Sequence, residues 1–376
     1  MSGHFQQGHT GTGIAYKLHL RIEKESMIMD AQQEFQEPVN RGESPEFVKT
    51  SMAGAMCMGL ASGRFHRNAR CGCLNLLLTY RDGCRASCSF CGLAGNRRAD
   101  TPDTFIRVKW PTYRMSEVLS RLHTGKHPFQ RACVSMVTHE RALDDAYTII
   151  KALRKHTDLP ISGLLSPTVM KAGDLEIIRD AGADRVDIAM DAVTPRLFEK
   201  HRAKGVGGPH HWEIYMQYLE DAIKVFGSYR VGVHLIVGLG ETEEQMIAFI
   251  DRAHKMEIFT HLFSFFPESG SILEHHPQPP LKQYRHVQLA RYLINENIVS
   301  LDSMHFSPYG EVVDFGVEID PYIDLGMPFM TSGCPGNDGI LACNRPFGNE
   351  RASEPMRNYP FLPEREDLEI IRNQLR

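Results

Sequence analysis

The stretch LNLLLTYRDGCRASCSFC, residues 74–91, is the part of the sequence from which the fold is best inferred. Its first half is a continuous apolar run, which is typical of a strand buried on both faces of a sheet. Its second half places Cys84, Cys88 and Cys91 in the loop that directly follows this strand. Because α/β barrels place their chemistry at the carboxyl ends of the strands, the sequence predicts a functional site at this loop.

Further short apolar runs follow, and stretches with helical periodicity separate them. The additional strands are expected at residues 131–139, 159–166, 185–190, 229–238 and 260–267. Strands that alternate with helices of this length predict right-handed β-α-β units and a parallel sheet. We therefore predict an α/β fold, a partial (β/α)6-type TIM barrel. SMHFSPYG, residues 303–310, is a candidate seventh strand.

Four parts are expected along the chain. Residues 1–45 are polar and aperiodic and are predicted to form a mobile tail. Residues 46–72 are expected to form an N-terminal helical extension, because 46–62 is rich in small residues and methionine. The barrel is assigned to 73–320. Residues 321–376 are predicted to be irregular, and such a segment is usually functional or held by something other than an apolar core.

Charge and hydropathy exclude several classes of protein. The 376 residues carry 42 basic and 46 acidic side chains, a net charge of −4, which gives no basic footprint for nucleic acid. No apolar run reaches the ~18 residues that a membrane-spanning helix needs. The N-terminus lacks the basic-then-apolar order of a secretory signal. We expect a cytoplasmic protein that binds neither nucleic acid nor membranes.

The nine cysteines are odd in number and unevenly clustered, which does not fit a disulfide framework in a chain without an export signal. Clustered thiols in a reducing compartment are better interpreted as metal ligands or redox groups. Cys57, in the methionine-rich run, and Cys133, within the second expected strand, are interpreted as packing residues.

The triplet Cys84, Cys88 and Cys91 forms a C-x3-C-x2-C motif. Three thiolates on one tight loop can face a single centre, and they leave one iron of a four-iron cluster open for another ligand. A structural zinc site completed by His66 or His139 is the alternative. Structural zinc sites usually use paired C-x2-C hooks, so an iron–sulfur cluster is favoured.

The pattern C-x3-C-x-aromatic-C after a first barrel strand resembles the radical S-adenosylmethionine (SAM) superfamily. In that superfamily the cluster binds the amino and carboxylate groups of SAM at its open iron. An electron from the cluster cleaves SAM to methionine and a 5′-deoxyadenosyl radical, which abstracts a hydrogen atom. The resemblance implies that Cys84, Cys88 and Cys91 are the catalytic ligands of a [4Fe–4S] cluster.

The resemblance also implies residues that contact SAM at the strand ends. HLIVGLGE, residues 234–241, matches the segment that contacts adenine, and THE, residues 138–140, stands where the superfamily has Gly-Gly-Glu. Without that resemblance these residues would be interpreted as a glycine turn, a helix cap and a solvated arginine at a helix end. The implied cofactor-binding residues are Phe90, Glu140, Asp191, Arg202, His234, Ile236 and Gly238.

Residues 190–205 and 237–245 resemble lipoyl synthases and, less closely, biotin synthases. Both families insert sulfur at unactivated C–H positions and draw it from a second, sacrificial iron–sulfur cluster. This chain lacks the three-cysteine N-terminal motif of one-chain lipoyl synthases. Its Cys334 and Cys343 form C-x8-C in the irregular tail, an arrangement that looks like the two-protein type of lipoyl synthase.

The ligands of the second cluster are less narrowly defined. A strand rises about 3.3 Å per residue, so Cys73 is expected near the barrel floor, roughly 20–25 Å from the triplet. Either Cys73 and the tail pair share a cluster at the floor, or Ser353 or a partner chain completes one at the top. The candidate ligands are Cys334, Cys343, Cys73, Cys71 and Ser353.

The expected function is therefore sulfur insertion into an octanoyl chain on a lipoyl carrier protein or domain. The expected partners are that carrier, a paired radical SAM protein and a ferredoxin- or flavodoxin-type electron donor. One alternative is a biotin-synthase-like enzyme that acts on a free small molecule. A non-catalytic metal-binding protein is the other.

Overall fold

The computed structural model describes residues 42–67, 69–97, 104–105, 108–343 and 355–376. Almost all of the expected N-terminal tail lies outside these residues, and so does Ser353.

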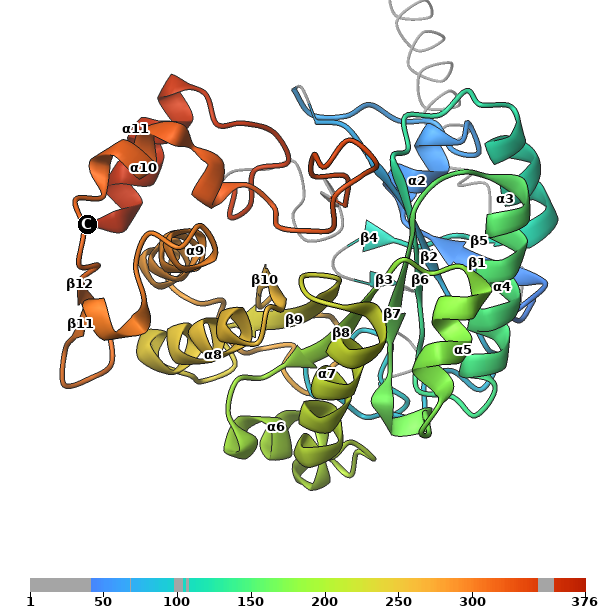
Figure 1. Ribbon diagram of the computed structural model, residues 1–376, viewed down its shortest axis with the longest axis horizontal. Helices are drawn as coiled ribbons and strands as arrows, with labels where there is room; N and C mark the ends of the chain where they lie inside the picture. Colours follow the sequence, from blue (N-terminus) through green and yellow to red (C-terminus); the bar gives the residue numbers. More distant parts are fainter. Residues whose placement is uncertain (1–41, 68, 98–103, 106–107, 344–354) are drawn as a thin grey trace, which may run out of the picture. The chain divides into compact units, whose positions relative to one another are not determined.

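An eight-stranded sheet in the order β10-β9-β8-β7-β6-β2-β1-β5 forms the centre of the fold (Figure 1). Its parallel strands are β2 (Cys73–Leu77), β6 (Arg131–Ser135), β7 (Ile161–Leu165), β8 (Arg185–Asp191), β9 (Val231–Val237) and β10 (Phe259–Ser264). Within the described residues no strand pairs β10 with the opposite edge, so the sheet stays open. The predicted partial (β/α)6 barrel is confirmed.

Helices follow the strands and cover the outer face of the sheet (Figure 1). They are α3 (Met115–His123), α4 (Ala142–His156), α5 (Asp174–Ala181), α6 (Pro195–Arg202), α7 (Trp212–Phe226), α8 (Glu243–Lys255) and α9 (Leu281–Asn295). Each of the longer helices turns an apolar stripe to the sheet, as Ile149, Ile150 and Leu153 of α4 do. None of the helices in the described residues is long and apolar enough to cross a membrane.

Side chains alternate between the two faces of each parallel strand. On β8, Val186, Ile188 and Met190 belong to the apolar core under the helices. The residues between them, Asp187 and Ala189, face the interior of the open barrel instead. The interior face is therefore partly polar, which a buried core would not require.

The sequence suggested a helix over residues 46–62, but the N-terminal extension is helical only in part. β1 (Phe47–Thr50) pairs antiparallel with β2 and with β5 (Thr112–Arg114), and only α2 (Met52–Cys57) is helical. Local periodicity missed β1 because its pairing partners lie far away in the sequence. A short hairpin of β3 (Thr104–Phe105) and β4 (Val108–Lys109) is separate from this sheet.

The prediction of a seventh barrel strand at residues 303–310 is wrong. β11 (His305–Phe306) pairs antiparallel with β12 (Val312–Asp314) in a separate two-stranded sheet. The C-terminal part is also less irregular than predicted, because it holds α10 (Asp320–Leu325) and α11 (Arg365–Leu375). The 3-10 turns η1 to η4 cover Pro167–Val169, Lys204–Val206, Leu301–Ser303 and Met327–Phe329.

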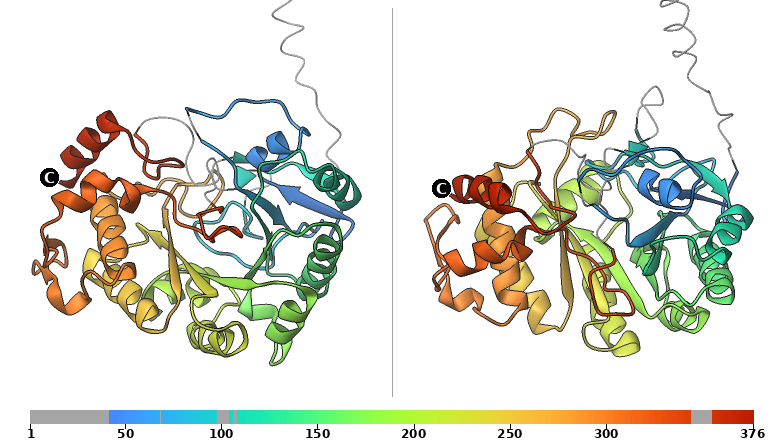
Figure 2. Two further views of the ribbon diagram at one scale, coloured as in Figure 1. Left: turned by 45° about the horizontal axis from the view of Figure 1, so that its top comes forward. Right: turned by 90° about the horizontal axis from the view of Figure 1, so that it is seen from above.

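Residues 331–343 return to the starts of the parallel strands, where they appear in orange-red in Figure 2. The Leu262 backbone N–H donates to Ser332 Oγ at 2.9 Å. Arg131 Nε donates to the Pro335 carbonyl at 2.5 Å, while its two terminal nitrogens donate to both carboxylate oxygens of Asp184. The tail is thus fixed to the barrel through a buried arginine.

We expect Arg131→Met to lower the free energy of unfolding by about 3 kcal/mol, because it leaves a partly buried carboxylate and a backbone carbonyl without their cation. Urea unfolding of the purified protein measures this change. Arg179→Met is the matched control, since Arg179 also pairs with an aspartate but is 45% exposed, and it should cost less than about 1 kcal/mol. Equal losses in the two variants would contradict this role for Arg131.

Candidate functional site

A cavity of about 200 Å³ opens toward the carboxyl ends of the parallel strands. Every parallel strand contributes at least one side chain to its wall, and the three triplet cysteines line it as well. The strand residues are Leu77, Ser135, Leu164, Leu165, Ala189, Asp191, His234, Ile236, Phe263 and Ser264. The predicted site at the first strand end therefore lies in this cavity.

The loop that carries the triplet is fixed from several sides. The Arg85 N–H donates to the Thr138 carbonyl at 2.8 Å, at the end of the neighbouring strand β6. The Ser89 N–H donates to the His201 carbonyl at 2.9 Å, and Ser89 Oγ lies 2.8 Å from His201 Nδ1. His201 Nε2 in turn lies 2.9 Å from the Leu239 carbonyl. These bonds hold the three thiols in one orientation before any ligand binds.

The triplet thiols suit a positively charged metal centre. Burial raises the pKa of Cys88, and it raises the pKa of Cys91 further, where the neighbouring thiols add to the effect. The Arg202 guanidinium beside Cys88 works against this shift. Three thiolates on one loop, of which Cys88 is buried, need a cation to compensate their charge, so the donor set fits an iron–sulfur cluster.

Arg202, the last residue of α6, is buried rather than solvated as the alternative interpretation had it. Its Nη1 lies 3.1 Å from Asp191 Oδ2 and donates to the Met190 carbonyl at 3.0 Å. Among the described residues its Nε has no hydrogen-bond partner. A buried guanidinium with one unused N–H can donate a hydrogen bond to a carboxylate, so it fits the carboxylate end of SAM.

Asp191 ends β8 with a left-handed backbone, φ +61°. It does not cap α6, because Thr194 fills that role by accepting the Leu197 N–H. Burial raises the pKa of Asp191, and Arg202 opposes the rise. A strained residue at a strand end, paired with a cation inside a cavity, is an arrangement typical of functional sites.

Three ionisable residues of the cavity were not predicted from the sequence: His210, Tyr215 and Glu268. Tyr215 Oη lies 3.0 Å from His210 Nδ1, and the Arg202 guanidinium lies 4.9 Å from the Tyr215 ring centroid. Burial lowers the pKa of His210 to about 2, so its imidazole is neutral. Glu268 follows the last parallel strand, and that position alone could have marked it.

The other predicted cofactor residues divide into two groups. Phe90, His234 and Ile236 line the cavity. Glu140 does not, because it is 64% exposed and paired with Arg85 at 2.6 Å. Gly238 is likewise not part of the wall; its N–H donates to Glu241 Oε1 at 2.6 Å in a turn with φ +107°, which fits the alternative interpretation as a glycine turn.

Four buried thiols meet deeper in the barrel, toward the starts of the strands: Cys73, Cys133, Cys334 and Cys343. Leu164 packs against this group and also lines the cavity. The four thiols therefore lie directly beneath the cavity floor.

The two sheet thiols meet because of strand register. Asn75 of β2 is paired with Cys133 of β6, and Cys73, two residues earlier, faces the same interior side. The interpretation of Cys133 as a packing residue is thus incomplete, because its side chain contacts other thiols. The strand period could have revealed this, because Cys133 lies two residues before Ser135 and therefore faces the same interior side of β6.

The two tail thiols lie at the two ends of a loop, residues 334–343, that a backbone hydrogen bond closes. The Cys343 N–H donates to the Cys334 carbonyl at 3.0 Å. A Cβ on Gly333 would lie 1.9 Å from the Cys343 carbonyl oxygen, so only glycine permits this approach. Burial, together with neighbouring thiols and Asp187, raises the pKa of Cys334 well above its usual range. Four thiols so buried also match the donor set of a metal centre.

Of the other two candidate ligands, the structure describes Cys71, which does not belong to this group. Cys71 lies in the apolar core, where its thiol donates to the Cys73 carbonyl at 3.3 Å and is also hydrogen-bonded to Cys57. Ser353 lies outside the described residues.

Residues 79–253 match the family model of the radical SAM superfamily. This chain carries a radical SAM domain. The matched range includes the cysteine triplet, Asp191, Arg202 and the cavity strands from β6 to β9. The cofactors of the superfamily are a [4Fe–4S] cluster and SAM, as the sequence predicted. Radical SAM chemistry is thus the activity class of this domain.

Several solved structures are similar to the chain. HydG, a maturase of the [FeFe]-hydrogenase, matches with 12% identity and a TM-score of 0.44 over 58% of this chain and 48% of its own. Methylornithine synthase (PylB) has 14% identity and a TM-score of 0.44, over 67% of this chain and 77% of its own. SuiB of Streptococcus suis has 14% identity and a TM-score of 0.42, over 57% and 45%. No curated protein matches the sequence.

We expect Arg202→Gln to weaken SAM binding about 10- to 100-fold, since a hydrogen bond to a charged group contributes about 1.5–3 kcal/mol. Equilibrium dialysis of labelled SAM against the reconstituted protein measures the Kd. Arg196→Gln, an exposed arginine on the same helix, is the control and should leave the Kd unchanged. Similar Kd values for both variants and the wild type would rule out this contact.

Proposed function

We propose that this protein is a radical SAM sulfurtransferase that inserts sulfur into an octanoyl chain held by a lipoyl carrier protein or domain. The observation that carries the proposal is the group of four thiols beneath the cavity that the triplet lines. A cavity with one cluster site at its mouth and another beneath its floor suits a reaction that needs both a hydrogen abstractor and a sulfur source.

Two sets of residues would hold the cofactors. Cys84, Cys88 and Cys91 would bind the [4Fe–4S] cluster, with Arg202 on the carboxylate of SAM. The four thiols beneath the floor would bind a second iron–sulfur cluster. When bound, the first cluster with SAM would supply the radical that removes a hydrogen atom from a carbon, and the second cluster would supply a sulfide to that carbon.

The walls of the cavity suit an unbranched alkyl chain. Much of the lining is apolar, and it includes Leu77, Met136, Leu164, Leu165, Ile236, Phe263, Phe265 and Phe266. Each methylene that leaves water for such a surface contributes about 0.8 kcal/mol to binding. The same side chains would exclude water from the reacting carbon.

The charges of the cavity favour an acyl chain in amide or ester linkage over a free acid. Among the described residues that line it, Arg202 is the one arginine or lysine, and it is already paired with Asp191. A free carboxylate substrate would therefore lack a cation of its own, whereas an acyl group on a carrier needs none. This argument favours the octanoyl carrier over a biotin-synthase-like small molecule.

Two further partners follow from the proposal. A chain with one sacrificial cluster adds one sulfur at a time, so a paired radical SAM protein would add the other. A ferredoxin- or flavodoxin-type protein would deliver the electron that each SAM cleavage consumes.

Anaerobic reconstitution with iron and sulfide tests the second cluster. We expect about eight iron per chain in the wild type and about four in Cys343→Ala or Cys133→Ala. Cys57→Ala is the matched control, because Cys57 is a partly buried thiol outside the group, and it should keep about eight. A wild-type content of about four would remove the proposed sulfur source, and a content near zero would favour a non-catalytic metal-binding protein.

The substrate is tested with an octanoylated lipoyl domain, SAM and dithionite, with and without the paired protein. Mass spectrometry of the domain should show the gain of one sulfur, and Cys88→Ala should form no 5′-deoxyadenosine because a triplet ligand is lost. Transfer of sulfur to a free acid but not to the domain would favour the small-molecule alternative. No sulfur on either substrate would reject sulfur insertion.

A further inference from the structure

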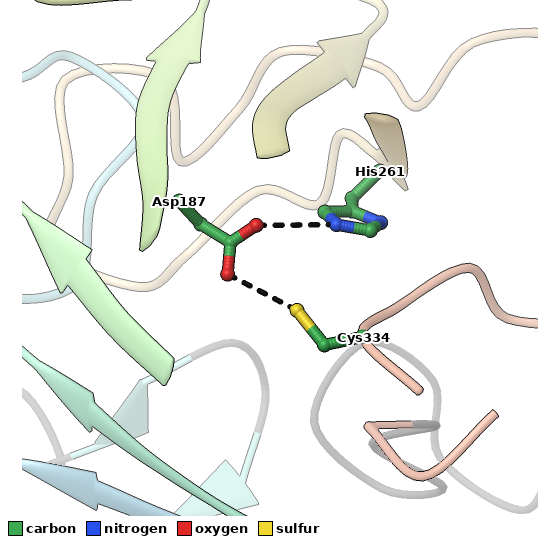
Figure 3. A group of neighbouring side chains, drawn as sticks. All are labelled: Asp187, His261 and Cys334. Atoms are coloured by element: carbon green, nitrogen blue, oxygen red, sulfur yellow. Dashed lines mark hydrogen bonds and ion pairs between the residues drawn. The ribbon is translucent and has the colours of Figure 1, made fainter. Parts of the chain in front are cut away.

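One corner of the four-thiol group differs from the others, because Cys334 also belongs to a second cluster of side chains (Figure 3). Its Sγ donates to Asp187 Oδ2 at 3.2 Å, and Asp187 Oδ1 lies 3.2 Å from His261 Nε2. The ligand atoms of the three residues all lie within 4.8 Å of one another. A thiol, a carboxylate and an imidazole thus converge at one point.

The pair of Asp187 and His261 depends on a gap in the strand between them. Asp187 lies on β8 and His261 on β10, and β9 separates the two strands. At Gly232 of β9, a Cβ would lie 1.8 Å from Asp187 Oδ1 and 2.8 Å from His261 Nε2. The two side chains therefore meet only because residue 232 has none.

His261 is a buried imidazole with one ring nitrogen that has no partner among the described residues. Its side chain is 5% exposed, and its Nε2 makes an ion-pair contact with Asp187. Within the described part of the chain, its Nδ1 has no hydrogen-bond partner. Imidazole is a common ligand of iron, so a nitrogen of this kind can serve a metal centre.

Two of the other thiols lie near weaker donors among the described residues. Cys343 Sγ lies 3.7 Å from the amide oxygen of Asn75, and Cys133 Sγ lies 3.9 Å from Ser135 Oγ. A neutral amide and a hydroxyl are weak ligands for iron compared with imidazole. Within the described residues, the group at Cys334 is the one set of three metal-ligating side chains that includes a histidine near these thiols.

We propose that His261 is a fifth protein ligand of the second cluster and can take the coordination position of Cys334 on the same iron. The inference rests on the proposed function, because it requires a second cluster at the four thiols. It deepens that function: a fifth donor beside the iron that Cys334 would hold could fill the coordination position that a departing sulfide leaves. Histidine replaces cysteine on iron in known mixed-ligand clusters.

The test uses reconstituted full-length protein, its iron content and pulsed EPR of the reduced state. Cys334→Ala should keep about eight iron and gain a strong ¹⁴N coupling that becomes a ¹⁵N coupling after labelling with ¹⁵N-histidine. The double variant Cys334→Ala/His261→Ala should lose that coupling and fall to about four iron. Cys343→Ala, the matched control at a thiol outside the group that contains His261, should fall to about four iron with no such coupling.

The outcomes separate this inference from the proposed function. About four iron in the wild type would overturn both. About eight in the wild type, with loss of iron or no histidine coupling in Cys334→Ala, would overturn the role of His261 alone. Iron at the triplet, about four per chain, reports that each variant folds. If Cys334→Ala loses the iron at the triplet, Cys334→Val is used instead, because valine refills the space of the thiol. The iron content and histidine coupling of that variant are then judged in the same way.

Discussion

The alternation of side chains along the parallel strands is the constraint on which both sites depend. On β2, Cys73 and Leu77 face the same interior, one among the four thiols and the other in the cavity wall. Four residues of strand separate them, roughly 13 Å. The pleat therefore sets two levels inside one barrel, with the four buried thiols at the lower level and the cavity at the upper one.

The C-terminal tail completes the lower level, because the sheet itself supplies only two of its thiols. Arg131 holds the tail at the Pro335 carbonyl, and the tight turn at Gly333 brings Cys334 beside Cys343. The sequence left open a cluster at the floor or one at the mouth. Contact of the tail thiols with Cys73 and Cys133 favours the floor.

Prediction succeeded where the determining contacts are local. The six parallel strands and their helices follow from periodicities of a few residues, and the triplet spacing lies within one loop. It failed where partners are distant in the chain. A helix was expected at β1 because residues 46–62 are rich in small residues and methionine. The pairing of β1 with β5 cannot be seen in that stretch of sequence. The alternation on β8 and β10 could have marked Asp187 and His261, but not that they meet across Gly232.

The sequence by itself determined the barrel type, the place of the triplet at the first strand end, and the superfamily resemblance. Each depends on spacing along a short piece of chain, which covalent geometry and the strand period preserve in any fold the chain adopts. Only the tertiary structure decided which of the other cysteines gather, that Glu140 stays outside the cavity, and that a histidine stands beside Cys334. These contacts join residues tens to hundreds of positions apart, so packing of the tail and sheet register control them.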